Sequence, residues 1–427
     1  MNKKLSIAVL SAICVTSLSA MGFQTIGYKS VSMGGAGVAS SSGSVATYNN
    51  PALLAKAPYA VEVSLGGGVS LQDHGAGASY TALSDSGFID LMDKAESLND
   101  LTTLSTDDVG DLFDGKDIIL DMNGDAIEIA AQVYFATQIQ NFGIGVFGQG
   151  NAIAQAVVDQ THTRLIYSDN GSYYAELNSD GTATVSNVSD YNAYSLYKAI
   201  EDGDTYVQVK AISLVEVPLA YAYKFELGAG NLMLGSALKY MQVTAYSKQY
   251  TIDSSDEAEN SVDEDKTTSN FALDIGLAYE PYFDKDLTVA LVGKNLNAPD
   301  FKFANGDNYT IDPMLRVGVA YDILDSLEFA MDMDLTKNET LLDDVNSQML
   351  GGGLNWNPAS WASLRAGLMT NLDSSDEAGV IYTTGFGLGV KWFQIDLSAQ
   401  YSPKTTTVDG TDYPSYAKVN LALISRW

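Results

Sequence analysis

The chain has 427 residues, 23 basic and 53 acidic, which gives it a formal charge of −30 at neutral pH. That sign excludes nucleic-acid binding, because binding to phosphates requires clustered lysine and arginine. Hydrophobic residues make up 46% of the chain and aromatic residues 10%, a composition that excludes general disorder. The single cysteine, Cys14, lies in an N-terminal apolar stretch, so a mature chain cleaved after that stretch has no disulfide, thiol chemistry or cysteine metal site.

The N-terminal sequence has the pattern of an export signal. Lys3 and Lys4 precede a mostly apolar stretch over 5–18 that is too short to anchor the chain in a bilayer, and small residues up to Ala20 offer cleavage points. The alternative is a buried N-terminal helix. The pattern favours a signal peptide over 1–20, and its removal leaves 21 basic residues and a charge of −32. We therefore predict an exported bacterial protein.

Residues 21–59 do not have the pattern of a strand. Met33–Ala39 is rich in glycine, serines follow it, and Asn50-Pro-Ala-Leu-Leu54 is turn-forming. A phosphate-binding loop is excluded, because Ser40 stands where a third glycine is needed and no helix start follows. Such irregular backbone is tolerated inside a barrel, where protein surrounds it. We predict a hatch, or plug, whose gate residues are Gly34, Gly35, Gly37, Asn50, Pro51 and Ala52.

The chain from residue 60 to residue 427 repeats segments of about ten residues in which apolar and polar side chains alternate. In Leu327–Leu335 every odd position is apolar, and the even positions include Glu328, Asp332 and Asp334. The expected strands lie near 60–72, 126–138, 142–153, 209–225, 231–247, 267–280, 287–296, 312–322, 327–337, 346–356, 361–371, 380–390, 391–401 and 415–427.

Alternation is equally typical of a soluble β-sandwich. The links between the expected strands decide between the two folds, because short and long links alternate along the chain. Short turns at one end and long loops at the other are typical of outer-membrane barrels. The fold class is therefore all-β, a transmembrane antiparallel β-barrel of about fourteen strands with an N-terminal plug, and its largest extracellular loops are 73–125, 154–208 and 248–266.

Aromatic residues lie beside the short links, for example Trp356, Trp361 and Trp392. This placement is expected of a girdle at the membrane interface, whereas core packing predicts no such bias. The C-terminal Trp427 resembles the terminal aromatic residue that the barrel insertion machinery recognises, which makes that machinery an expected partner.

Acidic residues gather in the long loops, for example Asp253, Asp256 and Glu257. Such clusters are usually solvated, and the alternative is that divalent cations bridge them to neighbouring lipopolysaccharide headgroups. Asp121–Asp125 lacks the full ligand set of a calcium loop. No cofactor is expected.

Helical spacing of apolar residues from Phe88 to Leu98 predicts a short amphipathic helix packed over the barrel mouth.

Several charged residues fall on the faces that would point into the lumen. They are Arg316, Arg365, Lys391, Asp274, Asp332, Asp334 and Asp396, with Lys418 and Arg426 at equivalent positions. Two interpretations stay open. Paired charges could brace the lumen and the plug, which suits the polar interior of barrels. Alternatively, they could line the path of a polar or anionic substrate.

A family resemblance covers about forty N-terminal residues. Gly22-Phe-Gln24, Met33–Ala39 and Asn50–Ala55 resemble the hatch of the FadL/TodX long-chain fatty acid transporters, and resemble more closely the conjugal-transfer TraF-like outer-membrane proteins. Gly293-Lys-Asn-Leu296 is also similar to a segment of this group. The resemblance implies a monomeric outer-membrane barrel plugged by 22–58 that moves hydrophobic small molecules. The thioredoxin-like conjugation protein that shares the TraF label depends on thiols, which a cysteine-free mature chain lacks.

Three functions are open to a chain with this pattern. The first is a plug-gated outer-membrane channel for small hydrophobic molecules, and the second is a non-transport scaffold of an envelope or conjugation assembly. The third, a barrel hydrolase, needs a histidine base beside a nucleophile. The only histidines, His74 and His162, lie in expected loops with no fixed spacing to serine and aspartate. We therefore expect that this protein is not an enzyme.

Overall fold

The computed structural model describes residues 24–94, 101, 103–169, 171–251, 266–284, 286–302, 308–342, 345–373, 378–390, 392–408 and 410–427. The predicted signal peptide, residues 1–20, lies outside them. So do Lys391 and the acidic loop residues Asp253, Asp256 and Glu257. No helix among the described residues is long and apolar enough to cross a membrane.

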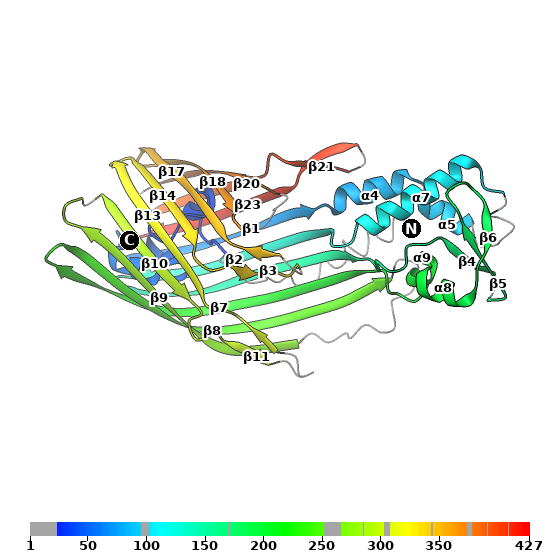
Figure 1. Ribbon diagram of the computed structural model, residues 1–427. Coiled ribbons are helices and arrows are strands. Elements are labelled where there is room, and N and C mark those ends of the chain that lie inside the picture. Colours follow the sequence, from blue (N-terminus) through cyan, green and yellow to red (C-terminus); the bar gives the residue numbers. More distant parts are fainter. Residues whose placement is uncertain are drawn as a thin grey trace.

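Fourteen antiparallel strands close into one barrel (Figure 1). The strands are β1 (Val61–His74), β2 (Ala126–Ile139), β3 (Phe142–Val157), β7 (Tyr206–Leu227), β8 (Gly230–Thr251), β9 (Lys266–Pro281), β10 (Leu287–Lys294), β13 (Met314–Leu324), β14 (Leu327–Asp334), β17 (Met349–Ala359), β18 (Ala362–Asn371), β19 (Ile381–Val390), β20 (Phe393–Tyr401) and β23 (Tyr416–Arg426). Each of the fourteen predicted strands is present. The barrel closes where β1 pairs with β23, and Trp427 continues this ladder through two backbone hydrogen bonds with Val61.

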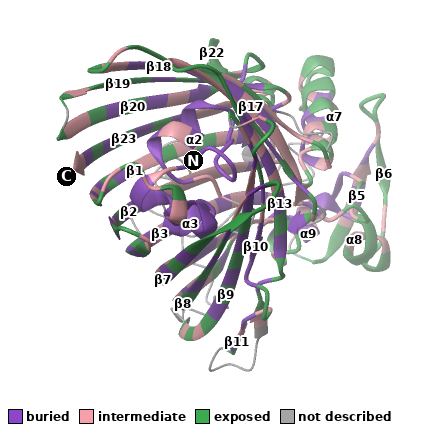
Figure 2. Cartoon of the chain, turned by 90° about the vertical axis from the view of Figure 1, so that its left-hand side faces the viewer, coloured by how far each residue is buried: buried purple, intermediate pink, exposed green. Residues whose placement is uncertain are grey.

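Burial alternates along the strands, as a membrane barrel requires. On β23, Val419 and Leu421 are 53% and 51% exposed on the outside, whereas Asn420 and Ala422 are each 1% exposed on the inside. The same striping runs around the wall in Figure 2. Trp356, Trp361 and Trp392 lie exposed beside the short turns, where the sequence places an interfacial girdle.

The N-terminal segment lies inside the barrel near the end with the short turns (Figures 1 and 2). It consists of α2 (Tyr28–Ser32), η1 (Gly43–Val45), α3 (Ala46–Asn49) and η2 (Pro51–Lys56). Nearly all residues from 26 to 54 are buried. Short helical turns suit this sequence, because its glycines, serines and Pro51 favour turns over long helices. We call residues 24–58 the plug segment.

At the other end, two long links form a separate loop subdomain (Figure 1). It comprises α4 (Ala76–Asp85), α5 (Phe88–Lys94), α7 (Thr106–Asp121), β4 (Ile166–Asp169), β5 (Tyr173–Leu177), β6 (Ala183–Val185), α8 (Val188–Tyr194) and α9 (Leu196–Glu201). Phe88 and Leu91 of α5 pack with Leu112 of α7 and Leu177 of β5 in one core. The described part of the predicted amphipathic segment is therefore helical, and residues 95–98 lie outside the described residues. Phe88 and Leu91 pack in this core and not over the barrel mouth.

The remaining strands form short hairpins at the same end. They are β11 (Asp300–Lys302) with β12 (Asn308–Thr310), β15 (Asn338–Glu339) with β16 (Asn346–Ser347), and β21 (Thr405–Val408) with β22 (Thr411–Pro414). The link between β14 and β17 folds into the mouth, where Leu342 packs against Ala126 and Ile153 of β2 and β3. The mouth is thus narrowed by a loop that crosses it.

Candidate functional site: the plug segment and the lumen cavity

Asp332 on β14 attaches the plug segment to the barrel wall. Its Oδ2 atom accepts hydrogen bonds from the backbone N–H groups of Gly37 and Val38 at 2.7 and 2.8 Å. A buried carboxylate that accepts two backbone N–H groups forms charge-assisted hydrogen bonds, which are about twice as strong as neutral ones. Asp332 and Gly37 were both predicted as site residues, and the structure brings them together.

Further polar contacts hold other parts of the plug segment. Glu62 on β1 accepts from the Ser44 N–H at 2.8 Å, and Thr383 on β19 accepts from the Gly34 N–H at 2.9 Å. Lys29 forms an ion pair with Glu328 at 2.5 Å, and Lys56 forms one with Glu280 at 2.6 Å. These contacts come from strands spaced around the barrel, so the segment is held on several sides.

Gly34 shows why glycine is needed in the plug segment. Its φ of +64° lies in the left-handed region, and a Cβ atom there would stand 2.6 Å from the backbone nitrogen of Gly352. Gly35 has φ +84° and its carbonyl accepts from the Thr25 hydroxyl at 3.4 Å. The plug backbone therefore rests directly on the backbone of β17, with no room for a side chain between them.

Asn50, Pro51 and Ala52 form the last turn of the plug segment before β1. The Asn50 side chain accepts from the Ala52 N–H at 3.0 Å and donates to the Val38 carbonyl at 2.9 Å. Pro51 follows as the first residue of η2, a position where its missing N–H costs nothing. Ala52, Leu53 and Leu54 pack on inward-facing alanines of β7 to β10. Asn50 therefore ties the two halves of the plug segment together.

The predicted lumen charges are largely paired. Arg316 contacts both carboxylate oxygens of Asp334 at 2.5 and 3.0 Å, and Arg365 contacts both oxygens of Asp396 at 2.8 and 2.9 Å. Asp274 is paired with Lys239 at 3.1 Å. These geometries favour the interpretation that paired charges brace the lumen.

The sequence reading missed a buried cluster around Lys239 on β8. The Lys239 ammonium is 2.6 Å from Glu216, and it donates to Asn295 at 2.7 Å. Gln149 joins this cluster to the plug segment, because its amide donates both to Glu216 and to the Tyr48 hydroxyl. Lys294 lies 3.2 Å from the centre of the Tyr48 ring. The cluster therefore links the wall to the plug segment without a direct ion pair.

The segment Gly293–Leu296 is the part of the sequence from which this cluster could have been suspected. Lys294 and Asn295 are almost fully buried, and Asn295 has a φ of +54°, which is uncommon for any residue but glycine. Its backbone N–H donates to Asp274 at 2.8 Å. A lysine and an asparagine at the end of an apolar strand could have indicated a polar site, but not its partners on β7 and β8.

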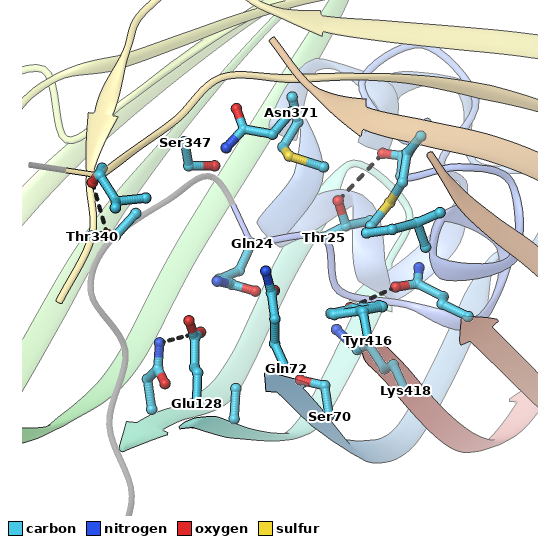
Figure 3. A pocket seen from close by; sticks show the side chains of 18 of the residues that line it. Gln24, Thr25, Ser70, Gln72, Glu128, Thr340, Ser347, Asn371, Tyr416 and Lys418 are labelled. Atoms are coloured by element: carbon cyan, nitrogen blue, oxygen red, sulfur yellow. Dashed lines mark hydrogen bonds between the residues drawn. The ribbon is translucent and has the colours of Figure 1, made fainter. Parts of the chain in front are cut away.

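A cavity of about 490 Å³ lies on the loop side of the plug segment (Figure 3). Gln24, Thr25, Gly34 and Gly35 of the plug segment form part of its lining. Strands contribute polar side chains, of which Ser70, Gln72, Glu128, Tyr416 and Lys418 are labelled in Figure 3. Thr340 and Ser347 enter from the loop that crosses the mouth. The cavity is large enough for a small organic molecule.

The two histidines occupy different places. His74 lines the cavity and lies 3.4 Å from Glu128. In the loop subdomain, His162 contacts the Asp159 carboxylate through Nδ1 at 2.7 Å and the Asn192 carbonyl through Nε2 at 3.1 Å. Both ring nitrogens of His162 are thus engaged in contacts within the loop subdomain. Among the described residues, no group of three or more histidine, cysteine or acidic side chains is placed to hold a metal ion.

Fold and lumen together define a transmembrane β-barrel that encloses its own N-terminal segment beside an internal cavity. The family model described as "F plasmid transfer operon, TraF, protein" matches residues 47–334, and the chain belongs to this family. This agrees with the resemblance inferred from the N-terminal motifs. No curated protein matches the chain.

Solved barrels share the architecture. The toluene transporter TodX of P. putida is similar with a TM-score of 0.50 and 11% identity, over 95% of this chain and 99% of that one. CymD, described as a monoaromatic hydrocarbon channel, is similar with a TM-score of 0.51 and 11% identity, over 96% of this chain and 99% of that one. At this identity the likeness shows the shared fold.

Proposed function

We propose that this protein is an outer-membrane channel for small hydrophobic molecules, closed by the plug segment and opened by its local rearrangement. The observation that carries this proposal is the position of the plug segment between the cavity and the short-turn end of the barrel. Its attachment through separate polar contacts at Asp332, Glu62 and Thr383 allows part of it to move while the barrel stays folded. Barrels of similar layout include proteins described as transporters or channels for toluene and monoaromatic hydrocarbons.

The remaining expectations fit this proposal. The apolar outer face suits a bilayer, residues 1–20 would direct export, and Trp427 would be read by the insertion machinery. The long-loop end would face outward among lipopolysaccharide, and the barrel would act as a monomer. Divalent cations bridging the acidic loop residues to lipid headgroups remain a prediction.

Flux into liposomes tests the channel. Purified protein reconstituted in vesicles should admit small aromatic molecules, and Gly35→Leu and Pro51→Ala should each change the rate while the barrel keeps its thermal stability. Unchanged influx of probe molecules and of antibiotics in both variants would remove the gating role of the plug segment. Absence of flux in the native protein would refute the channel itself.

The loop subdomain supports a second candidate, a scaffold within an envelope or conjugation assembly. It has its own apolar core and leaves Tyr173, Val185 and Tyr194 exposed at 41%, 74% and 45%. Crosslinking in the native membrane discriminates between the candidates. A scaffold should give stable protein adducts that disappear when the subdomain is deleted, whereas a channel should give few.

A further inference from the structure

The link between β14 and β17 spans the full width of the barrel mouth. We call its described residues, 335–342 and 345–348, the crossing loop. In the closed order of fourteen strands, β14 and β17 hold the ninth and tenth places, and β2 and β3 hold the second and third. The two pairs are therefore directly opposite each other. Leu342 of the crossing loop is buried against Ala126 of β2 and Ile153 of β3, so the loop reaches from one wall to the other.

Two leucines form the tip of the crossing loop, and each packs in an apolar cluster. Leu342 belongs to the cluster on β2 and β3. Its neighbour Leu341 packs against a second cluster, in which Phe301 and Ile311 of the link between β10 and β13 lie against inner side chains of β7, β8 and β9. Apolar contact is not directional, and breaking it leaves no buried polar group without a partner. The tip can therefore leave the wall without breaking a polar contact of its leucine side chains.

The tip belongs to a hairpin that is held together from within. Asn338 pairs with Ser347 in the ladder of β15 and β16, and the Asn338 amide donates to the Ser347 carbonyl at 3.3 Å. Nearer the tip, the Thr340 hydroxyl donates to the Val345 carbonyl at 2.8 Å. These contacts stay inside the crossing loop, so its described residues can move as one unit.

The root of the crossing loop is fixed by hydrogen bonds to the wall. Asn371, at the end of β18, donates to the Asn346 carbonyl at 2.9 Å and accepts from the Gln348 N–H at 2.8 Å. Asp334, at the end of β14, accepts from the Met349 N–H at 2.8 Å. Hydrogen bonds are directional, and those to a carboxylate are stronger than neutral ones. The root is therefore a fixed base about which the tip can swing.

The crossing loop and the plug segment both line the cavity. Thr340 and Ser347 enter the lining from the crossing loop, and Gln24 and Thr25 enter it from the plug segment (Figure 3). The plug segment lies toward the short-turn end of the barrel, and the crossing loop lies across the mouth at the other end. The cavity is therefore bounded by one of these segments on each side.

We propose that the crossing loop is a second gate, which opens the cavity toward the loop subdomain when its tip leaves β2 and β3. The root stays bound to Asp334 and Asn371 during this movement. This inference rests on the proposed channel and adds a step to it. The cavity is an occluded compartment between two gates, and a molecule crosses the barrel when the crossing loop and the plug segment have each moved.

Tethering the tip to the opposite wall tests the second gate. The chain after residue 20 has no cysteine, so Ile153→Cys with Leu342→Cys can be bridged by a short bismaleimide in the full-length mature protein. Bridging should lower the influx of small aromatic probes into vesicles about tenfold or more, relative to the same protein before bridging. The control is Asn338→Cys with Ser347→Cys, which bridges the hairpin to itself and leaves the tip free.

We expect the control bridge to leave influx unchanged. Unchanged influx after the 153–342 bridge, or an equal fall with both bridges, would overturn the second gate. Failure of the 153–342 pair to bridge would overturn it as well, because the tip would then not rest on this wall.

Two isoleucines of β3 provide a test that does not depend on flux. Ile153 is 1% exposed in the seat of the tip and is not part of the cavity lining, whereas Ile144 is 50% exposed on the outer face. Met369→Cys places a reactive thiol in the cavity lining. In detergent, Ile153→Ala should speed its reaction with a water-soluble maleimide by about five- to tenfold, and Ile144→Ala should not. Equal rates in the two variants would contradict the second gate.

The two measurements separate this inference from the channel proposal. If no probe crosses vesicles with the native protein but the reaction at position 369 depends on Ile153, the channel proposal fails and the gate stands. If probes cross with the native protein and neither the 153–342 bridge nor Ile153→Ala has an effect, the channel stands and the second gate fails.

Discussion

Asp332 joins the wall, the plug segment and the cavity through one carboxylate. One oxygen accepts the N–H groups of Gly37 and Val38, the other lies beside Gly318 of β13, and the residue as a whole borders the cavity. Side chains of this kind hold the plug segment in place, because the segment has no covalent link to the strands that surround it other than its continuation into β1.

Removing this carboxylate should loosen the plug segment. Hydrogen bonds to charged groups contribute about 1.5–3 kcal/mol, so Asp332→Ala should raise the population of the open state by roughly tenfold or more. Conductance and dye influx in vesicles measure this change. Asp286→Ala, at an exposed turn, is the control. Identical influx for Asp332→Ala and Asp286→Ala would show that Asp332 does not hold the plug segment.

Lys239 should matter for stability more than for gating. Lys239→Met would leave Glu216 and Asp274 as buried carboxylates without their ammonium partner, and such a loss costs about 3–5 kcal/mol. The free energy of unfolding, measured by urea titration in detergent, should fall by about that amount. Lys224→Met, at an exposed position of β7, should have little effect. A stability loss equal in both variants would refute the importance of the cluster.

At the scale of elements, the fit between the plug segment and the strands depends on backbone contact. Gly34 rests on β17, and Ala52 to Leu54 rest on small inward residues of β7 to β10. Close packing of this kind leaves little room for added atoms. The loop subdomain, by contrast, has its own apolar core. We therefore expect its stability to depend on pH independently of the barrel.

Gly34→Ala should displace the plug segment, because it adds both left-handed strain and a clash with β17. Gly87→Ala is a matched control, since Gly87 has a φ of +66° but open space around its Cβ position. We expect Gly34→Ala to raise protease sensitivity within the plug segment and vesicle leak by several-fold. If Gly87→Ala raises leak as much, the close backbone contact is not the cause.

The loop subdomain should respond to pH through His162 and Asp159. Burial alone would lower the pKa of His162, but the Asn192 carbonyl and the Asp159 carboxylate outweigh it and raise that pKa. Burial would raise the pKa of Asp159, but the hydroxyl and N–H of Thr161 and the His162 ring outweigh it and lower that pKa. The protonated histidine is therefore favoured in the folded state. Its stabilisation is complete below about pH 6.5 and is lost as pH rises through the raised pKa, whereas the Asp159 contribution is present above about pH 4 and is lost as pH falls.

Hydrogen exchange of residues 187–196, corrected for intrinsic pH dependence, measures this effect. Protection should fall between pH 6 and 8 in the native protein, and His162→Gln should remove that dependence. A pH profile that is the same in both proteins would show that the pair does not stabilise the subdomain.

At the scale of the whole molecule, the barrel was predictable from the sequence because alternation and link length repeat along the chain. All fourteen strands were found, although β7 begins at Tyr206 and β8 ends at Thr251, a few residues beyond the predicted limits. The pairs Arg316–Asp334 and Arg365–Asp396 were within reach of the same pattern. The cluster around Lys239 was not, although Glu216, Lys239 and Asp274 lie on the successive strands β7, β8 and β9, because alternation assigns side chains to the lumen face but does not give the strand register or the positive φ at Asn295 that bring them together. The small β4–β6 sheet was missed because its strands are short and irregular.

Lipid exposure at alternate positions is the central claim, and site-directed spin labelling tests it most directly. Cys14 is the only cysteine and lies within the predicted signal peptide, so single cysteines at 419, 420, 421 and 422 can be labelled in the mature protein. In bilayers, labels at 419 and 421 should be accessible to oxygen and shielded from a polar nickel reagent, and labels at 420 and 422 should be shielded from membrane oxygen. Uniform accessibility along the strand, or a mature protein that is folded and soluble without detergent, would contradict the account.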